Sequence, residues 1–383
     1  MIPTSVKEVK TLGWDYIDVI LFTGDAFIDH PSFGTAVIAR WLQKHGYRVA
    51  VVPQPNWRDD LRDFRKLGPP RLYFGVNSGA MDSMVNHYTA SKRLRSDDAY
   101  TPDWKAGQRP DYAVSVYTRI LKEIYPDIPV LIGGIEASLR RVTHYDYWQD
   151  SLKPSILVDS GADWLCYGMG ERTILEFTKA IEAGRNVNDI RKIPQLAFYM
   201  DGRCRVKDAV ILNSFERCCK DKPAFAENFH VIETYANMMY PPVLVEPVGK
   251  GYVQINPTWP PATQAEMDSF WDLPFTKLPH PRYKGKHIPA YEMIKFSVNT
   301  HRGCFGGCNF CTIAAHQGKF IQSRSEESII REISALKELP GFAGNVSDVG
   351  APTANMYGMR GRDQELCTRC RRKSCLFPSP CRN

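Results

Sequence analysis

The chain has 383 residues, of which 43% are hydrophobic, so it is long enough for two or more domains with buried cores. Its formal net charge is +7, but residues 360–383 carry seven basic and two acidic side chains, which leaves the rest close to neutral. A solvated basic tail explains this charge better than a nucleic-acid surface does. The apolar runs are too short to cross a bilayer, so we expect neither membrane nor nucleic acid as a partner.

The first 200 residues alternate between strand-like and helix-like segments. Apolar runs predict strands at 16–22, 47–52, 71–76, 129–132 and 163–167. Amphipathic patterns predict helices at 34–45, 112–125 and 171–183. This alternation predicts an α/β domain over residues 1–200, with an open parallel sheet of Rossmann-like or flavodoxin-like type.

A group of charged residues follows Gly133-Gly134 at the end of one predicted strand. Its members are Glu136, Arg140, Arg141, His144 and Asp146. Ligands usually bind at the carboxyl edge of a parallel sheet, where this group is expected. The pattern fits a solvated first helical turn with ordinary ion pairs equally well, so we assign it no catalytic role.

Residues 201–286 are rich in proline, as in Pro241-Pro242 and the run 257–261, and predict an irregular connector. A third segment, 287–383, follows it. There a strand at 294–300 leads into a loop rich in glycine and cysteine.

After that loop, Ser325 is a good N-cap for a helix over 325–336, and a further strand is predicted at 346–350. The buried stripe of this helix is expected to consist of Ile329, Ile330, Ile333 and Leu336. The order of strand, loop, helix and strand predicts the first βαβ unit of a parallel barrel or open sheet.

Cys304, Cys308 and Cys311 form a C-x3-C-x2-C motif on the loop. Three thiolates on one short loop can hold three irons of a [4Fe-4S] cluster and leave the fourth iron open. An open iron can bind a small chelating molecule and pass an electron to it. The alternative is a zinc site, but zinc takes four ligands, usually in two close pairs, and only His316 stands nearby as a fourth. The spacing therefore favours the cluster.

The strings around this motif resemble a known family. The loop after a first strand, with Phe310 just before the last cysteine, resembles the radical S-adenosylmethionine (radical SAM) superfamily. The longer strings at 287–294, 302–311, 316–328 and 347–357 resemble the YgiQ-type UPF0313 proteins. This resemblance implies an N-terminal cobalamin-binding-like domain followed by the start of a radical SAM partial (βα) barrel.

The resemblance also implies roles for individual residues. Cys304, Cys308 and Cys311 would ligate the cluster, and SAM would chelate the fourth iron. Phe310 would lie beside the adenine. The turn that contains Gly350, Ala351 and Pro352 would approach the methionine part of SAM. The usual pattern there has two glycines, and Ala351 departs from it.

The function implied is reductive cleavage of SAM, which starts radical chemistry on an unknown substrate, with an electron donor such as flavodoxin or ferredoxin. Eleven cysteines without an export signal fit the reducing cytoplasm. The alternative is a non-catalytic iron–sulfur or zinc binding protein derived from a truncated enzyme. We expect truncation because the stretch after Cys311 has room for about two βα units, whereas a partial barrel needs roughly six.

Cobalamin binding by the first domain is left open. Gly133-Gly134 and the run 168–173 carry the resemblance to cobalamin-binding-like domains. Domains that hold cobalt through a histidine use Asp-x-His-x2-Gly after the first strand. Here Asp29 and His30 are adjacent and Gly34 lies one residue too far, so His30 is expected to be a turn residue.

The last part of the chain holds four cysteines within fifteen residues: Cys367, Cys370, Cys375 and Cys381. Their C-x2-C-x4-C-x5-C spacing is compatible with zinc or with a second iron–sulfur cluster, and flanking basic residues favour thiolates. The spacing is tight for a zinc fold, so a second metal site stays an open alternative to plain thiols.

Overall fold

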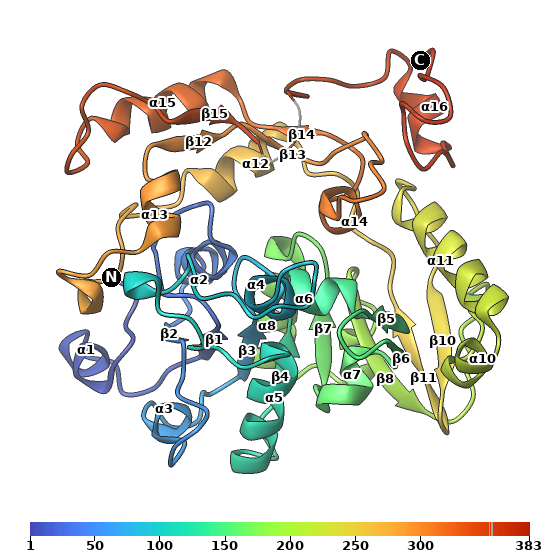
Figure 1. Cartoon of the computed structure of the whole chain (residues 1–383), viewed down its shortest axis with the longest axis horizontal. Coiled ribbons are helices and arrows are strands. Elements are labelled where there is room, and N and C mark those ends of the chain that lie inside the picture. Colours follow the sequence, from blue (N-terminus) through green and yellow to red (C-terminus); the bar gives the residue numbers. More distant parts are fainter. Residues whose placement is uncertain (352, 354) are drawn as a thin grey trace. The chain divides into compact units, whose positions relative to one another are not determined.

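The computed structural model of the protein describes every residue except 352 and 354 (Figure 1). The chain divides into two compact units. The first comprises Met1–Ile193 and Leu273–Lys295, and the second comprises Pro194–Asp272 and Phe296–Asn383. Within the described part of the chain, no helix has the length and apolar character needed to cross a membrane.

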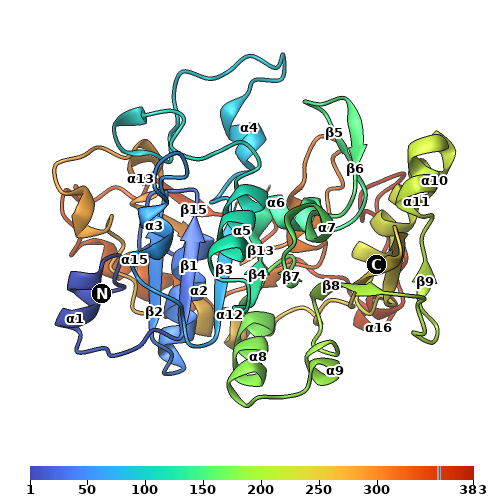
Figure 2. The ribbon, with the colours of Figure 1, turned by 90° about the horizontal axis from the view of Figure 1, so that it is seen from below.

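The first unit is built on five parallel strands that lie in the order β2-β1-β3-β4-β7 (Figure 2). They are β1 (Val19–Thr23), β2 (Val49–Pro53), β3 (Tyr73–Asn77), β4 (Val130–Ile132) and β7 (Trp164–Cys166). Every residue of β1, β2, β4 and β7 is buried, as expected for a sheet covered on both faces. The predicted open parallel sheet is confirmed, and its strand order is the flavodoxin-like one.

Three long helices cover this sheet: α2 (Gly34–Lys44), α5 (Ala113–Ile124) and α8 (Glu171–Glu182). Helix α2 connects β1 to β2, and α5 connects β3 to β4 in the opposite direction along the sheet. Right-handed crossovers therefore place α2 and α5 on opposite faces. Helix α8 packs against α2. These helices match the three that the sequence predicts.

Shorter elements complete the first unit. Its short helices are α1 (Val6–Thr11), α3 (Arg62–Arg65), α4 (Ser83–His87), η1 (Pro102–Trp104), α6 (Gly134–Leu139), α7 (Ile156–Ser160), α9 (Val187–Ile190), η2 (Pro281–Tyr283) and α13 (Pro289–Ile294). A hairpin is formed by β5 (His144–Asp146) and β6 (Ser151–Lys153).

The second unit contains a sheet in the stretch expected to be an irregular connector. Its strands are β8 (Leu196–Asp201), β9 (Val210–Ile211), β10 (Leu244–Val248) and β11 (Gly251–Ile255), and its helices are α10 (Phe215–Lys220), α11 (Lys222–Ala236) and α12 (Gln264–Trp271). Strand β11 pairs antiparallel with both β8 and β10. The expectation of irregular structure over 201–286 is therefore wrong. Most prolines there stand between helices and strands. Residues 244–255 form the antiparallel hairpin of β10 and β11.

The cysteine loop lies in the last part of the second unit. Its elements are β12 (Ser297–Asn299), β13 (His301–Arg302), α14 (Ile313–Gln317), β14 (Gln322–Ser323), α15 (Glu326–Leu336), β15 (Asp348–Gly350) and α16 (Gln364–Thr368). Strands β12 and β15 pair in parallel, and α15 lies between them in sequence, so the predicted βαβ unit is confirmed. A second pairing, between β13 and β14, was not predicted.

Helix α15 begins as predicted, because the backbone N–H of Ser328 donates to the Ser325 hydroxyl at 3.1 Å. Ile329 and Leu336 are buried with Val298 of β12, and Ile333 packs against them. Ile330 is an exception to the predicted stripe, since 59% of it is exposed.

Arg324 joins β12 to α15. Its side chain is fully buried and donates to the backbone oxygen of Asn299 at 2.7 Å and to that of Ser328 at 2.9 Å. It also forms an ion pair with Glu332, whose side chain is 8% exposed. A guanidinium that is out of water must be held by such partners, so the start of α15 and the end of β12 are fixed together.

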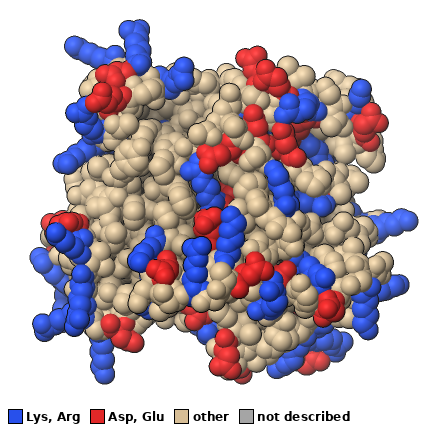
Figure 3. Space-filling view, turned by 180° about the vertical axis from the view of Figure 1, so that it is seen from behind, with Lys and Arg blue, Asp and Glu red and all other residues tan. Residues whose placement is uncertain are grey.

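Charges of both signs mix on the surface. On the face drawn in Figure 3, Lys and Arg side chains are interspersed with Asp and Glu. This distribution agrees with the nearly neutral charge of the chain before residue 360.

We predict that Arg324→Met destabilises the second unit by about 3–5 kcal/mol, because it leaves a buried carboxylate without its cation. Urea unfolding, followed by hydrogen exchange in β12 and α15, measures the change. The matched control is Arg331→Met, whose ion pair with Asp272 is exposed and should be worth about 1 kcal/mol or less. Equal effects of the two substitutions would contradict the role given to Arg324.

Candidate functional site

The predicted cluster cysteines lie on the loop between β13 and β14. The pairing of His301 with Ser323 and of Arg302 with Gln322 closes the base of this loop. Inside it, the backbone N–H of Gly303 donates to the Gln317 side chain at 3.0 Å, and the N–H of Cys304 donates to the oxygen of Gly318 at 3.0 Å. Helix α14 is thereby tied to the start of the cysteine motif.

The three thiols of the motif are free. Cys304 and Cys311 are half-buried, and Cys308 is exposed. A Cβ placed on Gly306 would stand 3.4 Å from the sulfur of Cys304 and 3.7 Å from that of Cys308. Both sulfurs therefore face the space that the missing side chain of Gly306 leaves open, and a thiophilic inorganic core fits this donor set.

The described residues contain no group of three or more His, Cys, Asp or Glu side chains close enough to hold a metal ion. The assignment of Cys304, Cys308 and Cys311 as cluster ligands therefore stays a prediction. His316, the candidate fourth zinc ligand, lies on α14 and is half-buried.

The predicted SAM turn lies at the same edge as the start of the loop. Asn299 at the end of β12 pairs with Gly350 at the end of β15, and the N–H of Thr300 donates to the Gly350 oxygen at 2.7 Å. Ala351 follows and is half-buried, whereas Pro352 lies outside the described residues. Because parallel strands end on one side, the turn and the cysteine loop leave the sheet together.

Phe310 lies on the cysteine loop with 90% of its surface exposed. An exposed aromatic ring next to a cluster cysteine is available for stacking on a planar ligand. Its predicted contact with adenine stays a prediction.

Two residues near the loop were not singled out from the sequence. Lys319, only 3% exposed, lies between α14 and β14, and Ser374, 2% exposed, lies in the final segment. Lys319 donates a hydrogen bond to the backbone oxygen of Arg372 in the final segment, and the Ser374 hydroxyl donates to the backbone oxygen of Phe305 on the cysteine loop. The sequence gives little sign of this, since lysine and serine are usually exposed.

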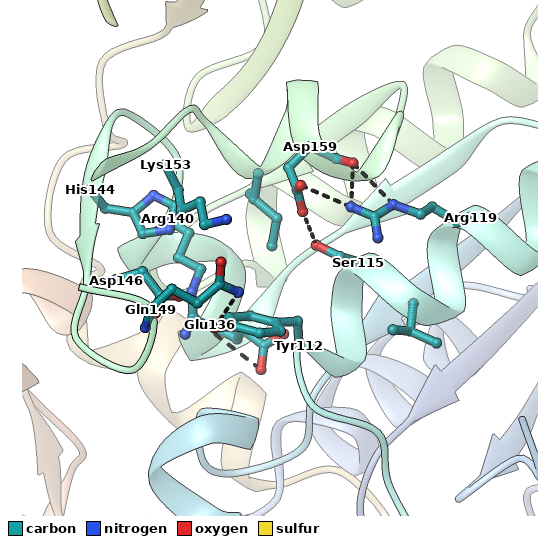
Figure 4. Close-up of a pocket in the computed structure, with 12 residues that line it drawn as sticks. Tyr112, Ser115, Arg119, Glu136, Arg140, His144, Asp146, Gln149, Lys153 and Asp159 are labelled. Atoms are coloured by element: carbon teal, nitrogen blue, oxygen red, sulfur yellow. Dashed lines mark hydrogen bonds and ion pairs between the residues drawn. The ribbon is translucent and has the colours of Figure 1, made fainter. Parts of the chain in front are cut away.

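The first unit has a cavity of about 250 Å³ at the carboxyl side of its sheet (Figure 4). Four of the five charged residues grouped by sequence line it: Glu136, Arg140, His144 and Asp146. Arg141 does not, because its guanidinium lies over the Tyr167 ring at 5.0 Å. The other lining residues come from α5, the β5–β6 hairpin and α7.

Glu136 is buried at the wall of this cavity. Its two carboxylate oxygens accept the backbone N–H groups of Ser83 at 2.8 Å and Val114 at 2.9 Å, which begin α4 and α5. Burial raises the pKa of Glu136 above its usual range, the charge of Asp82 adds to the rise, and Arg140 opposes it. Glu136 thus ties two helix starts together.

Several other charged groups of the cavity are also engaged. Arg140 pairs with Asp82, and Asp159 accepts a hydrogen bond from the Ser115 hydroxyl at 2.8 Å. Burial, followed by the positive charge of Arg140, lowers the pKa of His144 to about 4, so it is neutral at pH 7. The cavity can receive a small polar molecule, but its geometry assigns no catalytic role.

A flavodoxin-like sheet usually binds its ligand where β1 and β3 diverge. Here Arg109, which is fully buried, lies at the carboxyl ends of these strands. It donates to the Ser78 oxygen at 2.8 Å and pairs with Asp25 at 2.9 Å and Asp98 at 3.1 Å. The protein's own side chains therefore fill this position.

His30 follows β1 and has no exposed surface. Its Nδ1 accepts the backbone N–H of Ser32 at 3.1 Å. Burial, with a smaller contribution from the charge of Lys277, lowers the pKa of His30 to about 3. A buried imidazole held in this way agrees with the expected turn residue.

Comparison with known proteins identifies the class. A family model described as Radical SAM N-terminal matches residues 1–297, and the chain belongs to this family. The chain is 57% identical over 385 residues to a UPF0313 protein of Porphyromonas gingivalis, covering 100% of this chain and 61% of the relative. It is 43% identical over 436 residues to the UPF0313 protein YgiQ of Escherichia coli, covering 99% of this chain and 59% of the relative. These relatives confirm the resemblance seen in the sequence.

The chain spans about three fifths of the length of these curated relatives. Among solved structures, it is similar to TsrM, a radical S-adenosylmethionine methyltransferase from Kitasatospora setae with cobalamin and a [4Fe-4S] cluster bound. That likeness has a TM-score of 0.45 at 16% identity and covers 88% of this chain and 48% of TsrM.

We predict that His30→Asn weakens the acid sensitivity of the first unit. Unfolding lets the wild-type imidazole take up a proton below about pH 6.5, whereas the folded state resists this until about pH 3. Holding His30 neutral therefore costs no stability above about pH 6.5. As the pH falls below this value, the free energy of unfolding decreases, by about 2 kcal/mol at pH 5. An asparagine oxygen can still accept the Ser32 N–H.

Urea unfolding at pH 7.5 and pH 5 tests this, with exposed His287→Asn as the control. The loss of stability on acidification should be about 2 kcal/mol smaller in His30→Asn than in the wild type or the control. An identical loss in all three proteins would show that His30 is not held neutral in the fold.

Proposed function

We propose that the chain is part of a radical SAM enzyme that binds a [4Fe-4S] cluster through Cys304, Cys308 and Cys311 and binds SAM beside it. The observation that carries the proposal is the arrangement of three free thiols on one loop next to the β12–β15 edge, in a chain of the Radical SAM N-terminal family. When bound, such a cluster supplies the electron for reductive cleavage of SAM.

The protein itself would position the sulfur ligands and keep large side chains out of the space beside them. Gly306 leaves room beside the sulfurs of Cys304 and Cys308, which a larger side chain would fill. Gly350 and Ala351 bring backbone to the edge where SAM would lie, and the exposed ring of Phe310 offers a surface for adenine. Pro352 belongs to the same proposed turn.

The partners follow from the same chemistry. Cluster reduction requires an electron donor, and we propose a small redox protein such as flavodoxin or ferredoxin. All eleven cysteines are free, which fits function in the reducing cytoplasm. Cobalamin is not part of the proposal. The Nδ1 of His30 accepts a backbone hydrogen bond, and its unpaired Nε2 is buried and away from any cobalt ion at the surface.

A non-catalytic protein that holds zinc or an iron–sulfur centre is the competing function. It shares the thiol loop but requires no SAM site. Metal and sulfide analysis separates the zinc form from the cluster, and SAM binding separates an inert cluster from a radical SAM centre.

We predict that anaerobic reconstitution with iron and sulfide loads about four irons that depend on the loop cysteines. The triple variant Cys304→Ala/Cys308→Ala/Cys311→Ala should contain about four irons and four sulfides fewer than the wild type. The matched control is Cys219→Ala, since Cys219 is an exposed thiol on α10, and its iron content should not change. Stoichiometric zinc at the loop without acid-labile sulfide would replace this proposal with the zinc-binding alternative.

A further inference from the structure

One wall of the cavity in the first unit is formed by the β5–β6 hairpin. His144 pairs with Lys153 across its two strands, and Asp146 stands two residues after His144. Cross-strand partners, and residues two apart in one strand, lie on the same face of a sheet. All three side chains line the cavity and extend toward it from the hairpin (Figure 4). Tyr145, between them in sequence, belongs to the opposite face and is 50% exposed.

Asp146 brings a buried carboxylate to this wall. The residue is 2% exposed, and its Oδ1 accepts the backbone N–H of Gln149 at 2.8 Å. The Tyr112 hydroxyl lies near the carboxylate, but within the described residues no group donates a hydrogen bond to Oδ2. The charge of Arg140 acts on Asp146, although Arg140 donates its own hydrogen bonds to Asp82. A buried carboxylate oxygen requires a donor, and a positively charged donor suits it best.

His144 adds a second acceptor on the same face of the hairpin. Its ring is neutral at pH 7 because of its lowered pKa, and its Nδ1 lies 3.1 Å from the backbone oxygen of Val142. A carbonyl oxygen can only accept, so Nδ1 carries the proton and Nε2 keeps a lone pair. Asp146 and His144 together therefore suit a group that donates several hydrogen bonds, such as a primary ammonium.

Lys153 supplies the opposite charge. It is half-buried, and within the described chain no carboxylate forms an ion pair with its Nζ. The other two cations of the cavity are engaged, since Arg140 pairs with Asp82 and Arg119 pairs with Asp159 at 2.8 Å. Among the described residues that line the cavity, Lys153 is thus the cation left for a ligand, and a carboxylate is its natural partner.

The rest of the wall is partly apolar. Val116 of α5 and Ile156 of α7 line it, and Ile156 is 2% exposed. Tyr112, at the start of α5, has a φ of +51°, a left-handed conformation that is uncommon for an aromatic residue and recurs at ligand sites. The volume of about 250 Å³ lies below the range typical of drug-sized ligands, so the occupant is small.

We propose that this cavity binds a small aliphatic amino acid as a zwitterion. In this arrangement the ammonium group donates to Asp146 and His144, the carboxylate accepts from Lys153, and the side chain lies against Val116 and Ile156. Every residue that lines the cavity belongs to the first unit, whereas the thiol loop belongs to the second. The proposal is therefore independent of a bound cluster.

Calorimetric titration of the full chain tests the site, with L-alanine, L-valine and L-leucine as the probes. We expect at least one of them to bind. The N-acetyl derivative and the carboxamide of the tightest probe should each bind about 10–100-fold more weakly, because each lacks one of the two charged groups. Failure of all three amino acids to bind, as for a cavity that holds only water, would overturn the proposal. Derivatives that bind as tightly as the amino acid would overturn it as well.

Two substitutions locate the binding site. Asp146→Asn and Lys153→Met should each weaken binding of the tightest probe by about 10–100-fold. Exposed Asp127→Asn and Lys7→Met are the matched controls and should leave the affinity unchanged. An asparagine oxygen at position 146 can still accept the Gln149 N–H, so the hairpin keeps this bond. Unchanged affinity in both cavity variants would place the amino acid elsewhere and contradict the assignment.

Lys153→Met has a second readout that a misfolded variant would not reproduce. The wild-type chain should prefer the amino acid to its carboxamide, because only the free carboxylate attracts the ammonium of Lys153. The variant lacks this ammonium and should bind the two probes with equal affinity. A preference for the amino acid that survives the substitution would remove Lys153 from the site.

Discussion

The buried guanidinium of Arg324 is the interaction on which the candidate site depends. It binds the backbone at the end of β12 and at the start of α15, and its charge is met by Glu332. Strand β12 leads through β13 into the cysteine loop, and β15 pairs with β12 and carries the predicted SAM turn. The partners of this buried charge therefore hold together β12 and α15, the elements beside which both parts of the site lie.

The two units use the carboxyl edges of their parallel strands differently. In the first unit, Arg109 with Asp25 and Asp98 fills the position between β1 and β3, and the cavity lies beside β4 instead, around Glu136. In the second unit, the edge of β12 and β15 is followed by two small residues, Gly350 and Ala351, and by a loop with three free thiols. At the first edge, ion pairs fill the position between β1 and β3, whereas the second edge offers donors to a thiophilic group.

Much of this could be predicted from the sequence because the signals are local. The buried runs of β1 and β2, the stripe of α5 and the N-cap Ser325 follow from neighbouring residues and were confirmed. The hairpin β10–β11 was missed because prolines dominate the composition of the segment, and one of them, Pro247, stands within β10 itself. Contacts between residues far apart in the sequence could not be predicted. Nothing in the local sequence indicates that Ser374 binds a loop about seventy residues earlier, or that Lys319 is buried.

The central claim is that the loop cysteines hold a cluster with one iron open to SAM. Electron paramagnetic resonance of the reduced, anaerobically reconstituted chain, recorded with and without SAM, tests it most directly. We predict a [4Fe-4S] signal whose g values shift when SAM is added. A signal that SAM leaves unchanged, or no iron-dependent signal at all, would contradict the account.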